Sequence, residues 1–361
     1  MSEKVLMKGN EAFCEAAIRG GCRFYVGYPI TPQSEIPEYM SHEMPKRGGT
    51  FVQSESELGS INISYGIACA GGNVFVSSAS PGIALMQEGM SFACSAEVPI
   101  VILNVSRSGP GIGGIQPAQA DYFQVTRGGG NGDYKIPVFA PSTMQEAIDI
   151  IYNSFEIADQ LRNPVIILAD GMMGQMMEPV VLPEEKQPYK TEAEITKYKP
   201  WALTGTKNKD HRNRIVSYWA KPEELEHHII HLFEKYAKAE KELVRYETIG
   251  AEDPEIVFVA FGTMARIVAE VIEILNNEGI KAGMIRPISL WPFPKAPFEA
   301  LSPEKTKVVI STELSMGQLL ADVENSVQGR IPTRLINRVG GIVPTTNEIL
   351  ERAKKILGEL K

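Results

Sequence analysis

Short apolar runs alternate with longer amphipathic segments along most of the chain. Residues 99–105 and 164–170 are apolar almost throughout, which is typical of strands buried on both faces of a parallel sheet. Residues 143–161 have apolar positions at helical spacing and predict an amphipathic helix. The same strand–helix alternation repeats several times before residue 170 and predicts a doubly wound, parallel α/β sheet.

The pattern breaks after this sheet and then resumes. The intervening stretch has several prolines, mixed charge and one long charged helix expected at 222–245. A second, shorter set of apolar strands and amphipathic helices follows it, of a length usual for one domain. We therefore expect an α/β domain over 1–180, a linker over 181–250 and a second α/β domain over 251–361.

Composition and charge narrow the function classes. Of 361 residues, 43% are apolar and 22% charged, and the net charge is −8, which argues against a nucleic-acid binder or an anionic-membrane binder. No signal peptide is evident and no apolar run approaches the roughly 20 residues of a membrane span, so we expect a soluble, cytoplasmic protein. The four cysteines have no CxxC spacing, and we expect free thiols that hold no metal or iron–sulfur cluster. Cys69 and Cys94 lie among apolar residues and are expected to be buried.

The first candidate site is the turn after an expected strand at 24–27. Gly27 and Pro29 end that strand, Thr31 is a plausible N-cap, and Pro32 fits the first position of a helix. This arrangement would place a hydroxyl and open backbone N–H groups at the carboxyl end of a strand, where ligands bind in open α/β sheets. An ordinary βα turn fits the same pattern.

A second candidate is the acidic start of an expected helix after residue 53. Ser54 and Glu57 have capping-box spacing, and the rest of the helix is apolar nearly all round. Compensation of the helix dipole explains Glu55. Glu57 can instead be drawn inward by the apolar helix that it opens.

The third candidate is the glycine-rich loop over 106–114. It lacks the Gly-Lys-Ser/Thr ending of a P-loop, and no helix opens from it as in a dinucleotide fingerprint. Arg107 is either a surface charge or a fork for a carboxylate. A fourth pattern, His227 and His231 at i,i+4 spacing, has no matching third ligand, and a solvated helix face explains it better.

Several short motifs together carry a family resemblance. They are Tyr28-Pro29-Ile30-Thr31-Pro32, Glu57 within Ser-Glu-Leu-Gly, Ser80-Pro81-Gly82, residues 104–110 and residues 113–117. The chain resembles the alpha chain of the 2-oxoacid:ferredoxin oxidoreductases, thiamine-diphosphate enzymes related to pyruvate synthase, over nearly its whole length. Residues 115–123 and 127–134 are most similar to the branched-chain members, which use 2-oxoisovalerate.

The resemblance implies roles for particular residues. Residues 1–180 would form a pyrimidine-type domain, and 251–361 would resemble the C-terminal domain of transketolases. Glu57 would be the catalytic carboxylate at the ring nitrogen of the cofactor, and burial fits this role because it disfavours the charged form. Thr31 and Arg107 would bind the oxoacid. The implied cofactor contacts are Tyr28, Pro29, Ile30, Glu57, Ser80 and Pro81.

The resemblance also implies partners. Thiamine-diphosphate enzymes hold Mg²⁺ through a Gly-Asp-Gly segment and a downstream Asn, but here the nearest string is Ala169-Asp170-Gly171, without a fitting Asn. A beta subunit would therefore bring Mg²⁺ and the diphosphate half of the site. Gamma and ferredoxin-like delta subunits would carry iron–sulfur clusters, and ferredoxin and coenzyme A would be further partners.

The implied reaction is the oxidative decarboxylation of 2-oxoisovalerate with coenzyme A to acyl-CoA, CO₂ and reduced ferredoxin. Three alternatives stay open at this point. The chain can belong to a member specific for 2-oxoglutarate or pyruvate, to a transketolase-like enzyme without a redox role, or to a scaffold subunit that only organises its partners.

Overall fold

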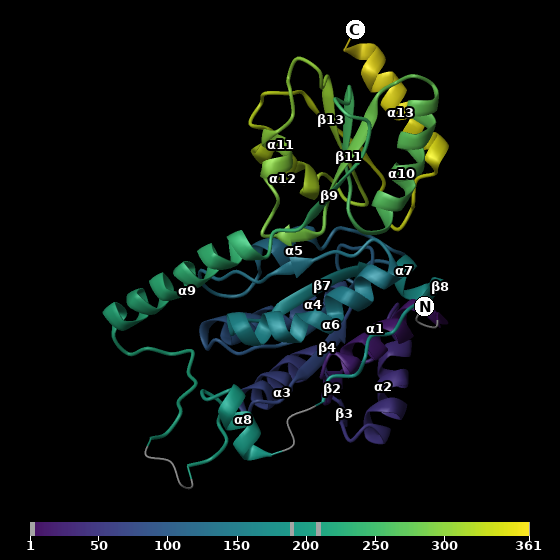
Figure 1. Ribbon diagram of the computed structural model, residues 1–361. Coiled ribbons are helices and arrows are strands. Elements are labelled where there is room, and N and C mark those ends of the chain that lie inside the picture. Colours follow the sequence, from purple (N-terminus) through teal and green to yellow (C-terminus); the bar gives the residue numbers. More distant parts are fainter. Residues whose placement is uncertain (1–3, 188–190, 207–210, 361) are drawn as a thin grey trace.

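The computed structural model describes residues 4–187, 191–206 and 211–360 (Figure 1). Within these residues, seven strands form one sheet in the order β12-β6-β7-β5-β4-β2-β3, parallel except for the pair β12–β6. The expected doubly wound parallel sheet is confirmed. Its strands are β2 (Phe24–Gly27), β3 (Thr50–Gln53), β4 (Val74–Ser78), β5 (Val101–Ser106), β6 (Val138–Phe139), β7 (Val165–Asp170) and β12 (Ser289–Trp291).

Helices cover both faces of this sheet because successive strand residues point to opposite sides. In β4, Val74 and Val76 belong to one apolar core, and Phe75 belongs to the other. The first core includes α3 (Glu57–Cys69) and α4 (Ser80–Ser95). The second includes α1 (Gly9–Arg19), α2 (Glu35–Lys46) and α6 (Met144–Leu161).

A second sheet, of five strands within the described residues, lies beside the first domain (Figure 1). Its order is β14-β13-β10-β11-β9, parallel except for β9 against β11. Helices α10 and α13 share one apolar core with it, and α11 and α12 lie on its other side. The elements are β9 (Tyr246–Gly250), β10 (Ile256–Val259), α10 (Gly262–Asn277), β11 (Ala282–Pro287), α11 (Ala296–Glu299), β13 (Val308–Glu313), α12 (Gln318–Val327), β14 (Thr333–Asn337) and α13 (Thr346–Glu359).

The remaining elements connect and brace these sheets. The expected charged helix is present as α9 (Pro222–Glu242), which runs along one side of the molecule toward β9 (Figure 1). A short antiparallel ribbon joins the two ends of the first domain. The other elements are β1 (Val5–Lys8), α5 (Tyr122–Arg127), α7 (Gly171–Gln175), β8 (Met177–Val180) and α8 (Glu192–Tyr198).

Two strands cross the divisions that the sequence pattern suggests. Residues 246–250 lie in the expected linker, yet β9 pairs with β11 of the second sheet. Residues 289–291 lie in the expected second domain, yet β12 pairs with β6 at the edge of the first sheet. The two sheets are therefore interlocked along the chain.

The expected starts of two helices are wrong. Helix α2 begins at Glu35, not at Pro32, and neither Thr31 nor its actual N-cap residue, Ser34, caps it through a side chain. Helix α3 is capped by Ser56, whose Oγ accepts a hydrogen bond from the Gly59 N–H at 3.1 Å. Ser54 instead contacts Ser60, because the turn after β3 extends further than a minimal βα turn.

Two other expectations concern thiols and membranes. All four cysteines are free, and the expected burial of Cys69 and Cys94 is confirmed. Cys14 and Cys22 are buried as well, and burial raises the pKa of the Cys22 thiol to about 12. Among the described residues, no helix combines the length and the apolar character that crossing a bilayer requires.

Candidate active site

The candidate residues meet at one edge of the first sheet. Strands β3, β2, β4 and β5 are consecutive neighbours and parallel, so their carboxyl ends lie side by side. The segments that leave these ends carry Glu57, residues 28–31, Ser80 with Pro81, and Arg107, respectively. The topology thus brings the candidate side chains to the position where open α/β sheets bind ligands.

Glu57 is a buried carboxylate at the start of α3. It is 5% exposed, and within the described residues no hydrogen bond or ion pair engages its side chain. Gly82, in the first turn of α4, lies directly against it: a Cβ at position 82 would be 2.5 Å from Glu57 Oε1. A mostly buried carboxylate without a protein partner is costly, so Glu57 differs from the hydrogen-bonded acids Asp121 and Asp170 at this edge of the sheet.

Arg107 is buried behind the turn that follows β2. It is 8% exposed, and its guanidinium donates to the carbonyl oxygens of Thr31 at 2.8 Å and Ile112 at 3.0 Å. Its Nε has no hydrogen-bond partner, and no salt bridge within the described part of the chain involves it. The bond to Thr31 joins the two residues that the sequence suggests for oxoacid binding and leaves the exposed Thr31 hydroxyl available.

The turn over residues 28–33 is fixed from beneath. Buried Gln33 accepts a hydrogen bond from Ser77 Oγ at 2.6 Å, and the Asn10 amide donates to the Pro32 carbonyl at 3.0 Å. Tyr28 and Pro29 are exposed, and Ile30 is half-buried. The hydrogen bonds of Gln33 and Pro32 therefore hold the backbone of the turn, while the side chains of Tyr28 and Pro29 point outward.

Asp121 is a residue that the sequence reasoning missed. It is 6% exposed and accepts hydrogen bonds from Ser80 Oγ at 2.6 Å and Asn104 Nδ2 at 2.9 Å. Burial raises the pKa of Asp121, and the Ser80 and Asn104 hydrogen bonds and the nearby Arg107 charge oppose that rise. In the sequence, the only local sign of its burial is that this acid lies between the apolar residues Ala120 and Tyr122.

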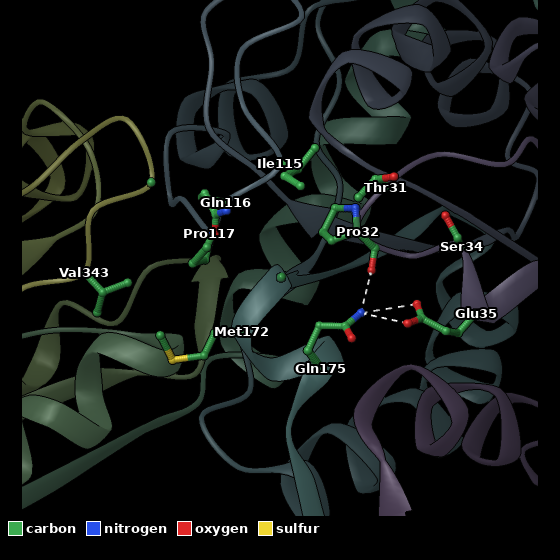
Figure 2. Close-up of a pocket in the computed structure, with 12 residues that line it drawn as sticks. Thr31, Pro32, Ser34, Glu35, Ile115, Gln116, Pro117, Met172, Gln175 and Val343 are labelled. Atoms are coloured by element: carbon green, nitrogen blue, oxygen red, sulfur yellow. Dashed lines mark hydrogen bonds between the residues drawn. The ribbon is translucent and has the colours of Figure 1, made fainter.

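A cavity of about 560 Å³ opens beside Thr31 (Figure 2). One wall is mainly apolar and includes Ile115, Pro117, Met172 and Val343. The opposite wall is polar, and there the Gln175 amide donates to the Pro32 carbonyl and to the Glu35 carboxylate. A second cavity of about 850 Å³ lies along residues 108–112 and also touches Asp121 and the loop before α12.

Asp170, within the string nearest to Gly-Asp-Gly, is already engaged. Its carboxylate accepts the backbone N–H groups of Met172 and Met173, both at 3.0 Å, and the hydroxyl of Thr263 at 2.5 Å. These bonds cap α7 and connect the end of β7 to helix α10 of the second domain. Its chemistry therefore fits a structural role rather than that of a magnesium ligand.

Both histidines of the i,i+4 pair on α9, His227 and His231, are exposed, as a solvated helix face predicts. His231 Nε2 is 3.2 Å from the Glu97 carboxylate, and its neighbour His228 contacts the Ser95 carbonyl at 2.6 Å. Within the described ranges, no cluster of three histidine, cysteine or acidic side chains could hold a metal ion.

Family comparisons agree with this geometry. The pattern of the family described as pyruvate flavodoxin/ferredoxin oxidoreductase, thiamine diphosphate-binding, matches residues 15–246. The pattern of the pyruvate:ferredoxin oxidoreductase core domain II matches residues 254–349. The chain belongs to the 2-oxoacid:ferredoxin oxidoreductase family. The family membership expected from the sequence motifs is thus confirmed.

Individual family members are similar to this chain over most of its length. The ketoisovalerate oxidoreductase subunits VorB of Methanothermobacter marburgensis and Methanothermobacter thermautotrophicus are 42% and 41% identical to it, over 98% of each chain. The 2-oxoglutarate synthase subunit KorA of Methanocaldococcus jannaschii is 35% identical, over 96% of this chain and 98% of its own.

Solved structures show the same architecture. The 2-oxoglutarate:ferredoxin oxidoreductase of Magnetococcus marinus, with 2-oxoglutarate, coenzyme A and succinyl-CoA bound, matches all of this chain with a TM-score of 0.85 and 27% identity. This chain spans 66% of that longer one. A split-gene transketolase in an inactive β4 tetramer, 16% identical with a TM-score of 0.59, shares the fold.

Proposed function

We propose that this chain holds the aminopyrimidine half of thiamine diphosphate in an enzyme that oxidatively decarboxylates 2-oxoisovalerate. The reaction would use coenzyme A and yield acyl-CoA, CO₂ and reduced ferredoxin. The observation that carries the proposal is Glu57, a buried carboxylate without a protein partner beside Gly82. When bound, thiamine diphosphate supplies the nucleophilic carbon for the keto group of the oxoacid.

Glu57 would exchange a proton with a ring nitrogen of the cofactor. Its position supports this role, because a group that accepts and returns a proton works best where water does not compete for it. Tyr28, Pro29, Ile30, Ser80 and Pro81 would contact the cofactor from the neighbouring turns. Their shared place at the carboxyl edge of the sheet supports that assignment.

Arg107 and Thr31 would bind the carboxylate of the oxoacid. A buried guanidinium that forms no salt bridge within the described residues favours an anionic ligand, and the Thr31 hydroxyl lies on the turn to which Arg107 is hydrogen-bonded. Holding the carboxylate in this way would orient the keto group for attack.

The apolar wall of the cavity beside Thr31 supports a branched aliphatic substrate. Ile115, Pro117, Met172 and Val343 offer no charge to the distal carboxylate of 2-oxoglutarate. The VorB relatives, which are named for ketoisovalerate, favour the same substrate class.

The remaining parts of the site would come from partner subunits. A beta subunit would carry Mg²⁺ and the diphosphate half, which is consistent with the structural engagement of Asp170. Gamma and ferredoxin-like delta subunits would hold iron–sulfur clusters that pass electrons to ferredoxin. The names of the relatives, each a subunit, support such an assembly.

The test is to purify the chain with its natural partners and to measure viologen reduction with coenzyme A across a panel of 2-oxoacids. We expect 2-oxoisovalerate to give the highest kcat/KM, above pyruvate and 2-oxoglutarate. A preference for 2-oxoglutarate would overturn the substrate assignment. Turnover without viologen reduction would point to the transketolase-like alternative.

Glu57→Gln tests the catalytic assignment in the same assembly. We expect kcat to fall by at least about 100-fold, the range for loss of a positioned proton-transfer group, while the subunits still co-purify. Glu55→Gln is the matched control, since Glu55 lies on the same turn but is exposed. Near-normal turnover of Glu57→Gln would remove Glu57 from the site and favour a scaffold role.

A further inference from the structure

Asp121 has no role in the proposed reaction, yet it is one of the most buried acids at the carboxyl edge of the first sheet. It lies just before α5, and the hydrogen bonds from Ser80 and Asn104 both reach the same carboxylate oxygen, Oδ2. Burying a carboxylate costs free energy that only hydrogen bonds or an ion pair can offset, so these two bonds are needed to keep Asp121 where it is.

Ser80 connects Asp121 to Arg107. The Ser80 oxygen lies 2.6 Å from Asp121 Oδ2 and 2.9 Å from both the backbone N–H and the carbonyl oxygen of Arg107. Because the hydroxyl has one proton, the shorter of its two possible bonds, the one to Asp121, takes that proton. The Ser80 oxygen then accepts the Arg107 N–H, so the three residues form one directed chain.

We propose that Asp121 is a positioning residue: by accepting the hydrogen bond of the Ser80 hydroxyl it fixes the backbone of Arg107, and with it the guanidinium at the oxoacid site. This inference rests on the proposed function, in which Arg107 binds the substrate carboxylate. The hydrogen-bond acceptor at position 121, and not its charge, carries the effect.

The second domain in turn fixes Asp121. On either side of it, the Gln119 N–H donates to the Leu314 carbonyl at 3.1 Å, and Gln318 of α12 donates to the Ala120 carbonyl at 2.7 Å. The Tyr122 hydroxyl donates to Asp322 at 2.7 Å. Segment 119–122 is therefore held by α12 and the loop before it, and the second domain acts on the oxoacid site through Asp121.

The experiment compares Asp121→Ala with Asp121→Asn in the complete assembly with its partner subunits. For Asp121→Ala we expect the KM for 2-oxoisovalerate to rise about tenfold, as for a lost buried hydrogen bond, with kcat within about threefold of wild type. Asp121→Asn keeps an acceptor oxygen of the same shape, so its KM should return to within about threefold of wild type. Equal damage in both variants would overturn the proposal, because the charge would then be what matters.

A double-mutant cycle with Arg107→Lys separates this inference from the proposed function. If Asp121 acts through Arg107, adding Asp121→Ala to Arg107→Lys should raise the KM no further. A second rise of about tenfold would overturn the positioning role. An unchanged KM in Arg107→Lys alone would instead refute the assignment of Arg107 as the carboxylate site.

Gln318→Ala tests the same series of hydrogen bonds from the second domain, and it leaves every buried carboxylate in place. We expect its KM to rise about threefold without a matching loss of kcat. Glu324→Gln, an exposed residue on the same helix, is the control and should leave KM unchanged. If Asp121→Ala does not assemble, Asp121→Asn and Gln318→Ala decide: a wild-type KM in Gln318→Ala, or a tenfold rise in Asp121→Asn, would refute the inference.

Discussion

Replacing Gly82 by alanine tests how closely the position of Glu57 is defined. The new Cβ would lie 2.5 Å from Glu57 Oε1 and 2.6 Å from its Cγ, and closer still to Ser78 Oγ. Since ordinary contacts of a Cβ are about 3.4 Å or more, the Glu57 side chain has to move by about 1 Å. A displacement of this size costs on the order of 100-fold in rate, or about 2.7 kcal/mol of activation free energy.

The effect on the free energy of unfolding should not exceed the effect on the activation free energy. Alanine is favoured over glycine inside a helix by up to about 1 kcal/mol, which offsets part of the overpacking cost of about 1–3 kcal/mol. We therefore expect the free energy of unfolding to fall by at most about 2 kcal/mol.

The assay is viologen reduction by the assembled enzyme, together with thermal unfolding of the same preparation. Gly66→Ala is the matched control: Gly66 lies in α3 with Glu57, and a Cβ there meets nothing within 4 Å. That variant should keep its activity and be no less stable than wild type. Full turnover of Gly82→Ala would refute the reasoning, because Glu57 would then tolerate displacement.

Two further substitutions test the neighbouring groups. In Arg107→Lys we expect the KM for the oxoacid to rise at least about tenfold, since a lysine cannot keep both carbonyl bonds and also offer a fork to a carboxylate; an unchanged KM would refute the role. Burial opposes ionisation of Glu35, but hydrogen bonds from Lys8 and Gln175 outweigh it and lower its pKa from 4.5 to about 2. Because a lowered folded-state pKa stabilises only above the unfolded value, stability should fall as the pH drops from about 4.5 toward 2. Urea unfolding of the isolated chain should show this loss reduced in Glu35→Gln but not in the exposed control Glu38→Gln, and an identical pH dependence in both would refute it.

Local composition was sufficient for most of the first sheet. The strands that became β2, β4, β5 and β7 are apolar runs that end in glycine, serine or acidic residues, and such runs are readable without tertiary information. The burial of Glu57 also followed from the apolar helix that it begins.

The features that the sequence did not predict depend on distant contacts. Strand β12 is three residues long and pairs with β6, about 150 positions earlier, so no local pattern identifies it. Thr31 was expected to cap a helix, but the turn continues to Ser34 because Gln33 is drawn into the core by Ser77. Asp121 stands out only once α12 is folded against its segment.

The placement of β12 bears on how this subunit can be divided. Cutting the polypeptide near residue 250 separates β12 from the first fragment. The two-residue strand β6 is then left as an unpaired edge of the first sheet. An unpaired sheet edge of this kind is a template for pairing with strands of other molecules. A two-piece version of the subunit would therefore need residues 289–291 on its N-terminal piece to cover that strand.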